Sequence, residues 1–128
     1  MKILGLIPAR SGSKGVPRKN IRLLGGLPLL EWTVREALSA GVFTQLVVST
    51  ESEEIAAIAR RAGAAVPFLR PEHLASDTAK SIDVVYAVLA ELERLGETYD
   101  AVCLLQPTTP FRSSSLIQAA IKKFREVN

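Results

Sequence analysis

A basic loop containing glycine follows a short apolar run near the start of the chain. The run, residues 3–7, predicts a buried strand. The following residues combine four cations with glycine and serine: Arg10, Lys14, Arg18, Lys19, Gly12, Gly15, Ser11 and Ser13. Glycine lets a backbone turn tightly and approach a ligand, and consecutive amides can form an anion-binding nest. Because Arg and Lys add charge-assisted hydrogen bonds to phosphate oxygens, the loop predicts a triphosphate site.

Two common phosphate-binding motifs are absent from this loop. A Walker A loop needs Gly-x-x-x-x-Gly-Lys-Ser/Thr, and no such spacing occurs here. The Gly-x-Gly-x-x-Gly pattern of dinucleotide-binding proteins is also missing. The alternative interpretation is a solvated basic turn. Four cations and two glycines directly after a buried strand argue against that alternative.

A second loop, residues 70–81, begins with an arginine at the end of a predicted strand. From there Arg70 can reach a phosphate or a base carbonyl. Asp77 and Ser81 lie around the start of the next predicted helix, so Asp77 is equally consistent with an N-cap and with a ligand contact. His73 is the only histidine and has no nearby partner in sequence, which favours a surface or packing role over catalysis.

A third loop, residues 106–113, follows another apolar run. Its two prolines fix the backbone around Thr108 and Thr109. Gln106 offers a donor and an acceptor in one planar amide, which suits reading the edge of a nucleobase. The alternative is a rigid turn that simply ends the strand.

Strands and helices are expected to alternate around these loops. Apolar runs predict strands at residues 2–7, 45–49, 66–69 and 101–105. Helical periodicity predicts helices at 29–40, 53–62, 82–95 and 116–127. The inward-facing residues of the first and third helices are expected to be Leu30, Val34, Ala37, Leu38, Val85, Val88, Leu89 and Leu92. This order predicts an α/β fold, a parallel sheet of about four strands with helices on both faces.

The same order predicts where a ligand binds. In open parallel sheets, ligands lie outside the carboxyl ends of the strands. The loops at residues 8–22, 70–81 and 106–113 are therefore expected to form one site.

Composition narrows the class of protein. A chain of 128 residues fits one domain. The first 30 residues hold six Lys or Arg and no acid, which favours a compact anionic ligand over a long polyanion. The single cysteine, Cys103, excludes an internal disulfide and is expected to be a small buried hydrophobe. No apolar run approaches the ~18 residues of a membrane span and no secretory signal is visible, so a cytoplasmic protein without a membrane partner is expected.

Four blocks of this sequence resemble those of the acylneuraminate cytidylyltransferases, also called CMP-sialic acid synthetases. The blocks are PARSGSKGVPRKN at 8–20, STES at 49–52, LRPEHLASDTAKS at 69–81 and LLQPTTPFR at 104–112. They occur in the family's order and at similar spacing, so the resemblance covers the whole chain. It implies a Rossmann-like nucleotide-diphospho-sugar transferase fold.

The resemblance also implies a reaction. Family enzymes couple CTP to the anomeric hydroxyl of a nonulosonic acid, a nine-carbon keto-sugar acid, and release pyrophosphate with Mg²⁺. Carried over by motif, Lys14, Arg10 and Lys19 are the expected catalytic residues, with Lys14 stabilising the leaving pyrophosphate. The expected nucleotide-binding residues are Ala9, Arg10, Ser11, Gly12, Lys14, Lys19, Asn20, Arg70, Asp77, Ser81, Gln106 and Thr108.

The chain departs from the family in length. Residues 1–128 resemble a single CTP-binding domain without the C-terminal half that family members carry. That half usually supplies the sugar pocket, a dimerisation element and the carboxylate that holds Mg²⁺, so no metal ligand is assigned here. A homodimer and a complementing C-terminal fragment are both open as partners. The acceptor is also open, with sialic and legionaminic acids favoured over Kdo. Glu51 stands where many relatives have Asp, and no role is assigned to it.

Two other functions remain as alternatives. The chain could be a nucleotide-binding half-domain that binds CTP without turnover on its own. A nucleic-acid binder is suggested by the pI of about 9.3 and the basic loop. That alternative lacks the aromatic platforms of single-strand binders, since the chain has only seven aromatic residues, and no nucleic-acid partner is expected.

Overall fold

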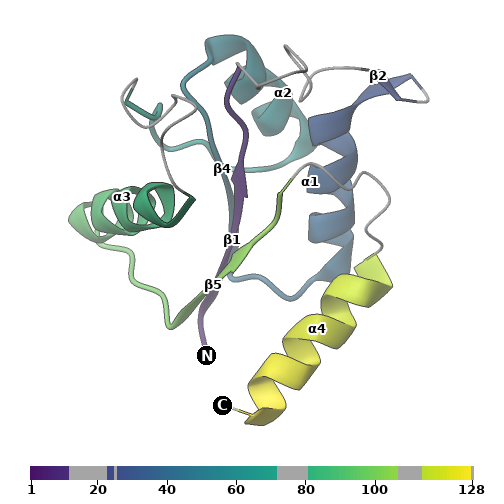
Figure 1. Cartoon of the computed structure of the whole chain (residues 1–128), viewed down its shortest axis with the longest axis vertical. Coiled ribbons are helices and arrows are strands. Elements are labelled where there is room, and N and C mark those ends of the chain that lie inside the picture. Colours follow the sequence, from purple (N-terminus) through teal and green to yellow (C-terminus); the bar gives the residue numbers. More distant parts are fainter. Residues whose placement is uncertain (12–22, 25, 72–80, 107–113, 128) are drawn as a thin grey trace.

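The computed structural model describes residues 1–11, 23–24, 26–71, 81–106 and 114–127. Its elements, in chain order, are β1 (Ile3–Pro8), β2 (Leu23–Leu24), β3 (Leu27–Pro28), α1 (Leu29–Ala40), β4 (Gln45–Ser49), α2 (Glu53–Ala62), α3 (Ser81–Arg94), β5 (Ala101–Leu104) and α4 (Ser114–Val127). The main sheet lies between helices, as the alternating pattern predicts (Figure 1). No helix in these ranges is long and apolar enough to cross a bilayer.

The central strand of the sheet is β1, which pairs in parallel with β4 on one side and with β5 on the other. Its residues are almost fully buried, because helices cover both faces of the sheet. Gly5 is required at the centre: a Cβ there would lie 2.8 Å from the Leu46 side chain and 2.9 Å from Phe43. The strand therefore combines apolar residues with one glycine that lets neighbouring side chains pack against its backbone.

Each face of the sheet has its own apolar cluster. On one face, side chains of β1 and β4 pack against α1 and α2, and the amino end of β1 packs against α4. On the opposite face, Leu4, Leu6 and Val47 pack against Val88 and Leu92 of α3. Figure 1 shows α3 on one side of the sheet and α1 with α4 on the other. The prediction of helices on both faces is therefore confirmed.

Most predicted elements agree with the structure. The helices at 29–40 and 53–62 and the strand at 45–49 match residue for residue. The third and fourth helices begin one and two residues earlier than predicted, and the last strand ends at Leu104. Cys103 is half-buried in that strand and packs against clusters on the α1 side of the sheet.

The strand predicted at residues 66–69 is wrong, and Pro67 explains why. Beside β4 the chain makes one parallel bridge, in which the Ala65 N–H donates to Leu46 O and the Val48 N–H donates to Ala65 O, both at 2.9 Å. The next donor in a parallel ladder would be residue 67, and proline has no N–H. The ladder is therefore interrupted before Arg70 N–H reaches Thr50 O at 2.7 Å.

Two further local features differ from the sequence expectation. Leu38 is 44% exposed rather than buried with Leu30, Val34 and Ala37. Leu38 lies at the margin of the apolar stripe of α1 and contacts Gly63. The Leu38 Cδ1 is 2.8 Å from the position that a Cβ on Gly63 would take. The short antiparallel pair β2–β3 before α1 was not predicted, because two-residue strands carry no periodic signal.

Candidate functional site

The carboxyl ends of β1 and β4 bring the start of the basic loop beside the connection from β4 to α2. Pro8 and Ser49 are the last residue pair of the ladder between these strands. One more backbone hydrogen bond follows it, in which the Ala9 N–H donates to Ser49 O at 2.9 Å. Ala9 is buried, Arg10 is half-buried and Ser11 is exposed. The chain therefore leaves the core at the residues predicted to meet the nucleotide.

The β4–α2 connection, residues 49–52, organises its surroundings through hydrogen bonds. Ser49 accepts from Arg70, at its Oγ from Nε (3.1 Å) and at its carbonyl from an Nη group (2.8 Å). Thr50 is fully buried and its Oγ1 accepts from the Ser52 N–H at 3.2 Å. Ser52 caps α2, accepting from the Ile55 N–H at 3.2 Å. Ser49, Thr50 and Ser52 thus fix Arg70, the connection itself and the start of α2, respectively.

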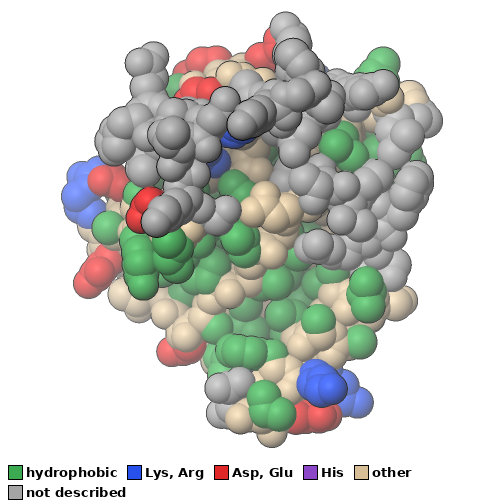
Figure 2. Space-filling view, in the orientation of Figure 1, with side chains coloured by type: hydrophobic (Ala, Val, Ile, Leu, Met, Phe, Trp, Pro, Cys, Tyr) green, Lys and Arg blue, Asp and Glu red, His purple; other side chains and the backbone are tan. Residues whose placement is uncertain are grey.

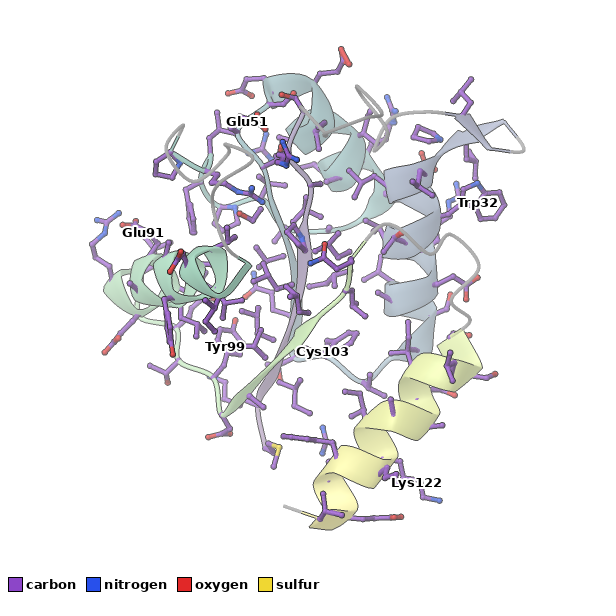
Figure 3. All side chains as sticks on the ribbon, viewed as in Figure 1. Trp32, Glu51, Glu91, Tyr99, Cys103 and Lys122 are labelled. Carbon is purple, nitrogen blue, oxygen red and sulfur yellow. The ribbon has the colours of Figure 1, made fainter. Side chains whose placement is uncertain are left out.

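Glu51, the remaining member of the connection, contacts the start of the basic loop. Its Oε1 accepts from the Ser11 N–H at 2.9 Å and its Oε2 accepts from Ser11 Oγ at 2.8 Å. Burial raises the pKa of Glu51, but the hydrogen bonds from Ser11 and the charge of Arg70 outweigh it, so this pKa lies below its ordinary value. Figure 3 shows Glu51 near the end of β4, beside α2.

Arg70 is a buried guanidinium, with only 7% of its surface exposed. Burial lowers its pKa, the charge of Glu51 opposes that change, and the charge of Arg10 lowers it further. Arginine nevertheless remains protonated at neutral pH. The guanidinium groups of Arg10 and Arg70 therefore repel one another at this edge of the sheet. In the described part of the chain, Glu51 is the acid whose negative charge stabilises Arg70. An anion that met both guanidinium groups would be stabilised there.

The other predicted residues divide into two groups. Gln106 follows Leu105, whose N–H donates to Leu6 O at 2.8 Å, so this half-buried glutamine lies at the carboxyl edge of the sheet as predicted. Ser81 is the first residue of α3. Outside the described residues lie the other predicted site residues, together with His73: Gly12, Lys14, Lys19, Asn20, Asp77 and Thr108.

No role was predicted for Ser49 and Glu51, although both stand in the STES block at 49–52. The predicted site comprised the loops after three strands and left out the connection after β4, although β4 is the immediate neighbour of β1. The available signal was the position of these residues at the carboxyl end of a strand that adjoins the first one. A second signal was the charge of Glu51, because residues 1–30 contain Lys and Arg but no acid that could pair with them.

The described residues form no metal centre at this edge. No group of three His, Cys, Asp or Glu side chains lies together among them. Two hollows occur elsewhere in the described part of the structure. One, of about 240 Å³, lies beside the amino end of β4, and another, of about 490 Å³, lies between Gly41 and α4. Neither hollow is lined by Arg70 or Glu51: the first includes Gln45 and Leu46 at the amino end of β4, and the second is lined by Gly41, Val42 and residues of α4.

Comparisons with known proteins identify the family of this chain. The family described as Cytidylyltransferase matches residues 4–128. CMP-N,N'-diacetyllegionaminic acid synthase of Legionella pneumophila is 46% identical over 122 residues, which are 95% of this chain and 53% of that protein.

Similar solved structures show the same fold. A CMP:2-keto-3-deoxy-manno-octonic acid synthetase complexed with CTP has a TM-score of 0.82 at 20% identity, covering 98% of this chain and 48% of that one. The manganese complex of Rv0371C from Mycobacterium tuberculosis has a TM-score of 0.59 at 20% identity, covering 95% and 59%. This chain spans about half the length of the curated relative, with 53% covered. From the match over residues 4–128, the chain belongs to the cytidylyltransferase family.

Proposed function

We propose that this chain is the nucleotide-binding part of a cytidylyltransferase that transfers CMP from CTP to the anomeric hydroxyl of a nonulosonic acid. The observation that carries the proposal is the position of two arginines at one edge of the sheet. Arg10 follows Ala9, whose N–H donates to Ser49 O, and the Arg70 guanidinium donates to Ser49 Oγ and O, directly beside the start of a glycine-containing basic loop. The similarity to the Legionella legionaminic acid enzyme supports the choice of acceptor class. Residues 1–128 would then form a single CTP-binding α/β unit.

The reaction needs positioning and charge neutralisation more than covalent chemistry. The sugar hydroxyl oxygen forms a bond to the α-phosphorus and its proton passes to solvent. The bond from that phosphorus to the bridging oxygen breaks, and pyrophosphate carries the electron pair away. Arg10, Lys14 and Lys19 are proposed to neutralise the phosphates, with Lys14 at the leaving pyrophosphate. Arg70 and Gln106 are proposed to complete the nucleotide pocket from neighbouring strands. The same proposal covers the other sequence-predicted contacts: Ala9, Ser11, Gly12, Asn20, Asp77, Ser81 and Thr108.

The described residues do not fit a divalent cation. Glu51 is the acid at this edge, and both of its oxygens accept hydrogen bonds from Ser11. No other two acidic, histidine or cysteine side chains join it in the described ranges. If Mg²⁺ serves the reaction, we propose that its ligands lie in the half of the relatives' length that this chain does not span. No step of the mechanism is therefore assigned to a metal here.

Thermal unfolding with each nucleotide tests the proposed specificity. The chain is heated with CTP, UTP, GTP or ATP, each with and without Mg²⁺. A ligand at a hundred times its dissociation constant adds ~2.7 kcal/mol of stability, which is readily measured in a domain of this size. CTP is expected to stabilise the chain most. Equal stabilisation by all four nucleotides would contradict a cytidylyl pocket.

Lys14→Ala tests the proposed catalytic role. In an active form of the enzyme we expect turnover to fall at least about a hundredfold, because a donor to the developing charge contributes ~3 kcal/mol to transition-state stabilisation. Lys122→Ala is the matched control, because it removes the same charge from exposed α4, far from the carboxyl edge (Figure 3). An unchanged rate in Lys14→Ala would remove the assignment.

A second candidate function is a CTP-binding half that turns over only with a complementing segment. The observation that favours it is the surface beside β5, one of the two edge strands of the described sheet. Its four residues are half-exposed, and the helices on either side expose Ile82, Tyr86 and Leu116. Figure 2 shows hydrophobic side chains gathered between α3 and α4. An apolar surface of this kind is typical of an interface.

Mixing distinguishes this candidate from the first. The chain alone is expected to bind CTP without forming a CMP-sugar. Addition of the separately produced C-terminal half of the Legionella relative is expected to restore product formation. Full activity of the chain alone, or a stable dimer of it by light scattering with no gain on mixing, would contradict the complementing segment.

A further inference from the structure

A carboxylate is an unexpected neighbour for a site that binds phosphates. By charge alone, Glu51 repels an anion placed between Arg10 and Arg70, and its removal would strengthen anion binding. The structure shows a second property of this residue that acts in the opposite direction. Glu51 holds Ser11, the residue at which the chain leaves the core and enters the basic segment.

The contact between Glu51 and Ser11 fixes both the backbone and the side chain of Ser11. The two hydrogen bonds, 2.9 Å from the N–H and 2.8 Å from Oγ, use separate oxygens of one carboxylate. Such a pair restrains position and orientation together, as other two-point contacts do. Forty residues separate the partners in sequence, so the contact ties the loop after β1 to the connection after β4.

The connection that carries Glu51 is itself well fixed. Thr50 on one side is fully buried, and Ser52 on the other side caps α2. Burial of Thr50 and the cap of Ser52 leave the backbone of Glu51 little freedom. Glu51 can therefore act as a rigid support for Ser11, rather than as a side chain that follows it.

We propose that Glu51 is a positioning residue, which holds Ser11 so that the basic segment starts in the geometry that receives the nucleotide phosphates. This inference rests on the proposed function for its ligand, but not for the contact itself. If Ser11 is already held in place, binding does not have to spend free energy on fixing it, and the apparent affinity is reduced only in proportion to the fraction of molecules in which Ser11 is in the binding position. The positioning effect and the charge effect of Glu51 thus have opposite signs.

Two substitutions separate these effects. Glu51→Ala removes both hydrogen bonds and the charge. Glu51→Gln removes the charge but keeps both contacts, because its oxygen accepts from the Ser11 N–H and its amide nitrogen donates to Ser11 Oγ. Glu53→Gln is the matched charge control, since Glu53 is exposed in the first turn of α2, two residues away.

Binding of CTP to the intact chain is measured by titration calorimetry. Glu51→Ala is expected to bind about tenfold more weakly than the wild type, as for a protein in which Ser11 is in the binding position in about a tenth of the molecules. Glu51→Gln and Glu53→Gln are expected to bind as tightly as the wild type or slightly more tightly. Equal or tighter binding by Glu51→Ala would overturn the proposal, because charge alone would then explain the residue.

A second measurement is independent of the nucleotide. Hydrogen exchange of the Ser11 amide, followed by NMR in the unliganded chain, is expected to accelerate at least about tenfold in Glu51→Ala and to stay near the wild-type rate in Glu51→Gln. If no nucleotide binds the wild type, the proposed function fails while this result still supports the contact. Unchanged Ser11 exchange in Glu51→Ala would overturn the positioning role whatever the ligand.

Discussion

Replacing Arg70 by methionine removes a buried guanidinium and keeps most of the aliphatic volume of the side chain. Ser49 Oγ, which accepts from Arg70 Nε at 3.1 Å, loses this donor, and Ser49 is 3% exposed. The Ser49 carbonyl also loses a donor from Arg70, but it still accepts from the Ala9 N–H at 2.9 Å. Of these two acceptors, only Ser49 Oγ is therefore left without another donor among these bonds. An unsatisfied buried group costs ~1–3 kcal/mol, and we expect a loss in that range.

Urea unfolding at neutral pH measures this loss. The midpoint is expected to fall with an unchanged slope, because the surface exposed on unfolding hardly changes. Arg94→Met is the control, since Arg94 is exposed on α3 and its guanidinium contacts Glu91 at the surface. That variant is expected to unfold at the wild-type midpoint. An Arg70→Met midpoint equal to the wild type would refute the reasoning, because it would mean that relief from burying a charge offsets the lost hydrogen bonds.

Three further predictions follow from other parts of the structure. Gly5→Ala is expected to destabilise the folded chain by about 1–3 kcal/mol, because the added Cβ would lie 2.8 Å from Leu46 Cδ1. Urea unfolding measures this loss, and an unchanged midpoint would show that Leu46 and Phe43 move aside readily. Ser52→Ala is expected to cost ~1 kcal/mol through loss of the cap on α2. Ser39→Ala, at an exposed position of α1, is the control, and equal midpoints for both variants would contradict the capping role. Because the folded-state pKa of Glu51 lies below its ordinary 4.5, its contribution to stability is present above that pH and is lost as the pH falls through the lower folded value. The wild type should therefore lose more stability than Glu51→Gln on acidification below pH 4.5, and parallel losses in acid urea titrations would contradict this.

Local signals made much of the fold predictable. The helix at 53–62 is preceded by the capping residue Ser52 and followed by Gly63, whose φ is +112°, so both ends were marked in the sequence. Apolar residues alone could not show that no strand forms at 66–69, because its absence depends on which backbone N–H groups of this segment face β4. That register places Pro67 where a donor is needed.

The site was predictable where it follows from strand order and unpredictable where it follows from register. Arg10 and Arg70 could be placed at the carboxyl edge of the sheet from the sequence, because each comes at the end of an apolar segment. Glu51 was given no role, because its partner, Ser11, is identified only by the pairing of Pro8 with Ser49, which brings together two residues forty positions apart. No periodic pattern records that relation between distant segments.

The place of β1 in the sheet has a consequence for synthesis of the protein. The strand made first is the central one: it pairs with β4 in the register Leu4 to Gln45 and with β5 in the register Ile3 to Ala101. During translation β1 can gain one neighbour early, but its second edge stays open until the last strand of the described sheet has been made. An open apolar strand edge is a site of unwanted association. Stalling before residue 101 should therefore leave nascent chains dependent on chaperones, whereas chains stalled after β5 would already have closed that edge.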